Sequence, residues 1–321
     1  MKHIFVSKHL LVLMLTLGIS LGTSIVAANA DLTQPLSVQM TLASGNNIVS
    51  GEPIVLLYKV SNSNASSLSV EMGLDGGAEG TDWVTRTLID ASGKQVLPLP
   101  DLLLRDSGGL HANGVIVQPQ IDRKGYLVVN HWFAISQPGR YTLAVHVHLP
   151  YVVGTSGQTG ETHEGNPQPY DKDFTFPLTI TQANSANIPL LAQSLLDKAT
   201  VSTDLEERRM LVQSLFSLPQ AQVWPQWEAA ASFPSLLNLV MAEAMRISSV
   251  QTADVLAQIG WGELVTSSPA SGEKRDRDNA VQVKLRQMYD RSSGSLRQHI
   301  KALYALHGVD VTKENIYVLN G

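Results

Sequence analysis

Two histidines that lie one residue apart, His146 and His148, are the side chains whose spacing most directly suggests chemistry. They stand in the stretch 141–149, where apolar residues alternate with others as in a β-strand. Side chains two apart on a strand share a face at roughly 7 Å, so both imidazoles can reach one metal ion. Zinc needs at least one further ligand. His131, on the preceding strand, would supply it if the register places it on the same face. The following loop offers further candidates: His163, Glu161, Glu164, Asp171 and Asp173. These four histidines are a candidate zinc or copper site.

The alternative interpretation of the pair is structural. Apolar residues occupy every second position of the same strand and would face a core: Tyr141, Leu143, Val145, Val147 and Leu149. His146 and His148 would then be polar residues of the solvent face. H-x-H alone is weakly specific, and the metalloprotease pattern H-E-x-x-H is absent, because the sequence reads HEGNP at 163–167.

Other patterns indicate no catalytic or cofactor-binding residue. G-x-S-x-G occurs at 18–22, but it lies inside an apolar segment rather than at a strand-to-helix turn. An acidic loop begins at Asp75, yet Arg86 stands where a calcium loop needs glutamate. No serine is marked as a nucleophile by an adjacent base, and glycine-rich phosphate loops are missing. We therefore expect no cofactor apart from the zinc or copper alternative.

The N-terminus has the pattern of a secretory signal peptide over residues 1–30. Lys2 and Lys8 precede an apolar run at 10–26, and the small residues at 28–30 make a cleavage site before Asp31. We expect a bacterial protein that is soluble in the periplasm or outside the cell after cleavage. An uncleaved anchor helix is the alternative, and no later segment is apolar enough to span a membrane.

The composition narrows the class of partner. The chain has 321 residues and a formal net charge of −5, which becomes −7 when the two lysines of residues 1–30 are removed. An acidic surface repels phosphate backbones, so we expect no nucleic-acid partner. The chain has no cysteine, which excludes disulfides, thiol nucleophiles and cysteine-bound metals.

Two hydrophobic periods divide the chain. Period two runs from residue 36 to 181 in about nine short segments, which predicts an antiparallel β-sandwich over 31–183. A linker at 184–187 follows, and helical spacing then predicts an all-α stack or bundle over 188–310, with a tail at 311–321. The fold class is thus α+β with segregated domains. The charged run EKRDRD after the loop 266–272 is expected to lie outside the helices.

The β half resembles the immunoglobulin-like domains of bacterial exported proteins. The stretches SGEPIVLLYKVSNSN, LIDASGKQV and GYLVVNHWFAISQPGRYTLAVHV carry this likeness, with Pro138 to Tyr141 in place of the hairpin turn before a late strand. The bacterial intracellular proteinase inhibitor domain is similar in arrangement, and the helical half resembles HEAT-like helix pairs. These resemblances imply folds and transfer no catalytic residue.

The sequence therefore predicts an exported, non-enzymatic binding or scaffold protein. Its sandwich would recognise a protein or glycan partner, and its helical half would act as a scaffold or a second docking surface. The alternative is a metal-binding or carbohydrate-active accessory protein that uses the His146/His148 face and the loop 151–172, which is long, polar and rich in glycine. Three tryptophans of the helical half, Trp224, Trp227 and Trp261, either fill gaps between helices or form an exposed docking patch.

Overall fold

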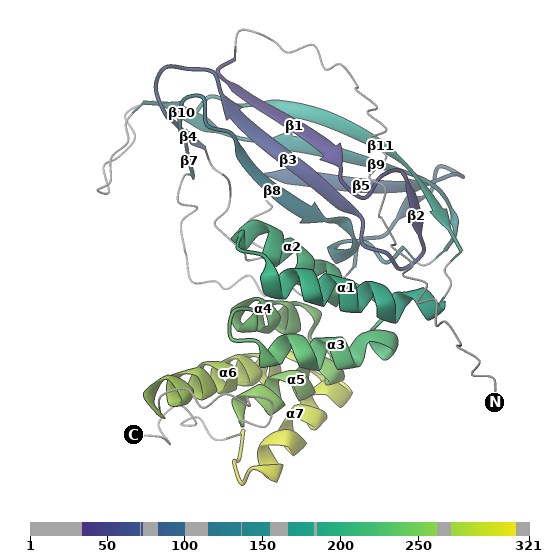
Figure 1. Cartoon of the computed structure of the whole chain (residues 1–321), viewed down its shortest axis with the longest axis vertical. Helices are drawn as coiled ribbons and strands as arrows, with labels where there is room; N and C mark the ends of the chain where they lie inside the picture. Colours follow the sequence, from purple (N-terminus) through teal and green to yellow (C-terminus); the bar gives the residue numbers. More distant parts are fainter. Residues whose placement is uncertain are drawn as a thin grey trace, which may run out of the picture. The chain divides into compact units, whose positions relative to one another are not determined.

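The structure is a computed structural model, with strands in the N-terminal half and helices in the C-terminal half (Figure 1). It describes residues 34–70, 72, 83–99, 115–135, 137–154, 166–182, 185–261 and 271–312. The predicted signal peptide and His163 lie outside these ranges. The predicted class, antiparallel sheets followed by an all-α part, is confirmed. Within the described ranges, no helix combines the length and apolar character needed to cross a bilayer.

Eleven strands occur within the described residues. They are β1 (Leu36–Leu42), β2 (Asn47–Val49), β3 (Val55–Asn62), β4 (Leu68–Val70), β5 (Val84–Asp90), β6 (Gln95–Val96), β7 (Val115–Val117), β8 (Arg123–Val128), β9 (Gly139–His148), β10 (Tyr151–Val153) and β11 (Asp171–Thr181). They form a five-stranded sheet in the order β2-β11-β9-β5-β6 and two three-stranded sheets in the orders β1-β3-β8 and β10-β4-β7. All strand pairs are antiparallel except β2 with β11, which is parallel.

Alternation along the strands builds the sandwich core. In β9, Leu143, Val145 and Val147 are at most 1% exposed, whereas His146 and His148 face solvent. Leu88 of β5 lies opposite Leu143 and is fully buried. Successive side chains of a strand point to opposite faces, so the period-two pattern places one complete set of apolar residues in the core. The expected faces of β9 are therefore confirmed.

The outer edge of β1 is closed by side chains. The Val38 N–H donates to the Tyr170 hydroxyl at 2.9 Å, and Lys172 Nζ donates to the Val38 carbonyl at 3.0 Å. Both groups of Val38 therefore point away from β3 and are already bonded. An edge strand with open N–H and C=O groups would be a template for pairing with another chain, and these contacts occupy part of that edge.

Seven α-helices follow within the described residues. They are α1 (Ile188–Val201), α2 (Leu205–Phe216), α3 (Gln220–Ser232), α4 (Leu237–Ile247), α5 (Val250–Gly260), α6 (Ser271–Arg291) and α7 (Gly294–Leu306). Asp204 caps α2 by accepting the Glu207 N–H at 2.9 Å. Ser249 and Thr252 form a capping box at α5, in which side chain and backbone bond reciprocally.

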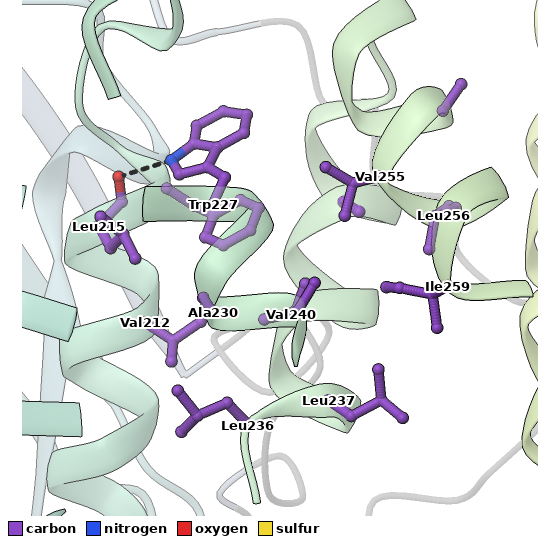
Figure 2. Packing of buried hydrophobic residues seen from close by; sticks show 14 of the residues in the cluster. Val212, Leu215, Trp227, Ala230, Leu236, Leu237, Val240, Val255, Leu256 and Ile259 are labelled. Carbon is purple, nitrogen blue, oxygen red and sulfur yellow. Dashed lines mark hydrogen bonds between the residues drawn. The ribbon is translucent and has the colours of Figure 1, made fainter. Parts of the chain in front are cut away.

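The helices pack around a continuous apolar core (Figure 2). Trp227 is fully buried, stacks on Phe216 at 4.4 Å between ring centroids, and donates its indole N–H to the Leu215 carbonyl at 3.1 Å. The prediction that Trp227 fills a gap between helices is confirmed. The charged run at 273–278, expected outside the helices, instead lies within α6, because hydrophilic residues on consecutive turns remain compatible with a helix.

Candidate binding sites

His146 and His148 belong to a ladder of exposed polar side chains on the outer face of the five-stranded sheet. The register of β9 against β11 places His146 opposite Asp173 and His148 opposite Asp171. His146 Nδ1 lies 2.9 Å from Asp173 Oδ1, and His148 Nδ1 lies 2.7 Å from Asp171 Oδ1. Asp171 Oδ1 is also 3.6 Å from His146 Nε2, so this carboxylate lies near both imidazoles.

This ladder is open to water. The side chains of His146 and His148 are 46% and 53% exposed, and those of Asp171 and Asp173 are 51% and 85% exposed. Each imidazole already has a carboxylate neighbour, and such exposed pairs contribute little to stability. Among the described residues, no three histidines and acidic residues are grouped as a metal site requires. The alternation correctly predicted that the pair faces solvent. Asp171 and Asp173, expected as candidate ligands in the following loop, instead belong to β11 and lie beside the two imidazoles.

His131 lies elsewhere, and its expected place on a strand is wrong. β8 ends at Val128, and a 3-10 turn, Val129–His131, follows it. Asn130 fixes this turn, because its side-chain oxygen accepts the Ile54 N–H at 2.6 Å. The turn directs His131 toward the helices rather than along the sheet. Its Nε2 lies 3.3 Å from the Gln213 carbonyl of α2 and 3.3 Å from Glu243 Oε2 of α4.

The surroundings of His131 hold its ring in the neutral form. Two acceptors face the same nitrogen, so Nε2 carries the proton. Burial removes hydration that a charged ring needs, and this outweighs the attraction of Glu243, lowering the pKa of His131 from 6.5 to about 4. Arg246 of α4 and Arg86 of β5 also disfavour a second positive charge. Glu243 keeps a cationic partner, because Arg246 Nε lies 2.8 Å from its Oε2.

A groove of about 550 Å³ lies in the helical half, away from the predicted histidine site. Residues of α3, α5 and the end of α7 line it: Gln220, Ala221, Trp224, Gln251, Asp254, Ala257, Gln258, Leu303, Leu306 and His307. Sequence reasoning missed this groove. Trp224, already considered as part of a docking patch, was the one signal that pointed to it.

Comparisons with known proteins identify no family for this chain. No protein-family model and no curated protein match the chain. A PapD-like domain of human CEP192 is similar at 9% identity and a TM-score of 0.24, over 47% of this chain and 87% of that domain. A CARDB domain from Pyrococcus furiosus, solved with two metal ions, is similar at 11% identity and a TM-score of 0.21, over 46% and 87%.

A longer match is to an Escherichia coli alpha-2-macroglobulin fragment that runs from domain MG7 to the C-terminus. Its identity is 10% and its TM-score 0.25, over 85% of this chain and 47% of that one. At these TM-scores the likenesses add nothing to the sheet topology described above. The finer resemblances, to the proteinase inhibitor and to HEAT-like helices, stay predictions.

Proposed function

We propose that this chain is an exported, non-enzymatic binding protein whose recognition surface is the groove between α3, α5 and α7. The observation that supports the proposal is that apolar and aromatic side chains are exposed at this groove. Leu306 is 80% exposed there, and Trp224 of the lining is only partly buried. Apolar side chains placed beside polar ones in a concave surface are typical of ligand sites.

The sandwich serves as a scaffold in this proposal. Residues 32–321 form one compact unit, and β8 packs against α2. The buried contact of His131 with Glu243 adds a polar link between β8's end and α4. Such a base supports a binding surface on the helices without contributing chemistry of its own.

The test uses the mature chain as bait against the exported fraction of its host. The Leu306→Ser variant removes apolar surface at the groove, and Leu190→Ser removes it from α1, where Leu190 is 71% exposed. We expect wild type and Leu190→Ser to capture the same partner and Leu306→Ser to lose it. Equal capture by all three would refute the groove as the recognition surface.

A metal-binding role at the sheet surface is the second candidate. Asp171 Oδ1 lies 2.7 Å from His148 Nδ1 and 3.6 Å from His146 Nε2, so these three side chains are neighbours, although they are not arranged as a metal site. A metal would have to replace these contacts and draw the three side chains around itself. Zinc and copper are the expected metals, since imidazole suits both. A ligand that binds only the folded chain raises its unfolding temperature. A rise with zinc or copper that disappears in the His146→Thr/His148→Thr variant would support this role, and no rise would exclude it.

A further inference from the structure

The groove has a polar floor. α5 contacts both α3 and α7, so it lies between them and forms the base on which the two walls stand. Gln251, Asp254 and Gln258 are spaced i, i+3 and i+7 along α5 and line the groove together. Asp254 is held in place by His299, whose Nε2 lies 2.6 Å from the Asp254 Oδ1. The base of the groove thus presents two amides and an oriented carboxylate.

The walls of the groove are aromatic and braced from behind. Trp224 of α3 lies 6.2 Å, between ring centroids, from the buried Trp227. His307, at the end of α7, is stacked on Trp261 at 4.0 Å with an interplanar angle of 4°. Rings supported in this way lose little conformational freedom when a ligand stacks on them, which favours binding.

This combination argues against two classes of ligand. None of the residues that line the groove is lysine or arginine, and one is an aspartate, so an anionic ligand would find neither an ammonium nor a guanidinium group there. An apolar face of a partner helix would cover Gln251, Asp254 and Gln258 without hydrogen-bonding them, and buried polar groups without partners are costly. A ligand that fits carries hydroxyls for the floor and flat apolar faces for the rings.

We propose that the groove binds an uncharged oligosaccharide, with the amides and Asp254 bonded to sugar hydroxyls and Trp224 stacked on the face of a sugar ring. Sugar rings offer both an apolar C–H face and hydroxyls that donate and accept. Trp224 supplies the stacking surface, and the two glutamines each offer a donor and an acceptor. This inference rests on the proposed function, because it names the ligand class of the same groove.

Isothermal titration calorimetry on the full mature chain tests the proposal. The probes are neutral hexasaccharides of glucose, of xylose and of N-acetylglucosamine, an acidic hexasaccharide of galacturonic acid, and an amphipathic helical peptide. We expect at least one neutral hexasaccharide to bind and the acidic one to bind at least tenfold more weakly. Trp224→Ala should weaken binding by about tenfold or more, as expected for loss of a stacked aromatic ring.

Matched variants separate the groove from the rest of the surface. Gln251→Ala changes an exposed glutamine of the floor and should weaken binding several-fold, whereas Gln298→Ala changes an exposed glutamine of α7 outside the lining and should leave it unchanged. Gln251→Ala also keeps the test decisive if Trp224→Ala fails to fold. The proposal would be overturned if both glutamine variants lost oligosaccharide binding equally, or if neither variant lost it.

The remaining outcomes distinguish this inference from the proposed function. If only the peptide binds and Leu306→Ser abolishes that binding, the oligosaccharide proposal is overturned and the groove remains a recognition surface. If no neutral hexasaccharide binds at millimolar concentration, the proposal is overturned as well. The proposal that the groove is the recognition surface is refuted only if Leu306→Ser also leaves partner capture unchanged.

Discussion

Acidification is expected to destabilise this protein through one buried histidine. The pKa of His131 is about 4 in the folded chain and 6.5 in its ordinary environment. A folded pKa below the unfolded one means that the unfolded chain binds more protons between these values, so the free energy of unfolding falls as the pH falls from 6.5 to 4. A difference of about 2.5 units corresponds to roughly 3 kcal/mol at 1.36 kcal/mol per unit.

The groups around the ring define the variant that tests this. The Gln213 carbonyl and the Glu243 carboxylate face Nε2, and Arg246 and Arg86 contribute positive charge nearby. His131→Gln keeps an N–H donor of similar reach and removes the titration. Between pH 7 and pH 4, the unfolding free energy of His131→Gln should therefore fall by about 3 kcal/mol less than that of the wild type. Urea unfolding of both proteins at several pH values measures this difference.

Two results would refute the reasoning. The first is a pair of parallel pH profiles, with the wild type and His131→Gln losing stability equally between pH 7 and pH 4. The second is a midpoint near 6.5 for the His131 ring when its titration is followed by NMR, because such a ring would not be desolvated in the folded chain. Either result would also argue against a buried contact between His131, in the turn after β8, and Glu243 of α4.

Four further predictions concern other parts of the chain. N-terminal sequencing of the protein exported by its host should start at Asp31, and an intact Met1 would exclude cleavage. A fragment of residues 31–183 should give a β-type circular dichroism spectrum, whereas a helical or unfolded spectrum would contradict the domain division. The His146→Thr/His148→Thr variant should unfold within about 0.5 kcal/mol of wild type. Val145→Thr, which buries a hydroxyl, should cost about 1–3 kcal/mol in the same urea experiment.

Strand faces could be predicted because they depend on local alternation. The buried positions of β9, such as Val145, and the exposed His146 follow from the period of two that any strand obeys. The end of β8 could not be predicted in this way, since Val129 continues the apolar pattern. Asn130 ends the strand there through a bond to the Ile54 N–H, a partner 76 residues away.

The sites depended on contacts that no local pattern encodes. His131 fitted a metal hypothesis because its type and approximate position suited one, but its partners, Gln213 and Glu243, are distant in the sequence. The groove likewise combines Trp224 with α5 and α7, which meet only after the helices pack. A single tryptophan indicated exposed aromatic surface, and only the packing showed what lies beside it.

The two edges of the β1-β3-β8 sheet make different contacts, and one of them joins the β half of the chain to the helical half. At the β1 edge, the Val38 backbone is hydrogen-bonded by the side chains of Tyr170, just before β11, and Lys172, in β11. At the opposite edge, β8 packs against α2, which belongs to the helical half. A fragment that stops at residue 183 keeps the Val38 hydrogen bonds and loses the contact of β8 with α2. If such a fragment folds but self-associates, the exposed β8 edge is the expected cause, because unpaired strand edges promote pairing between chains.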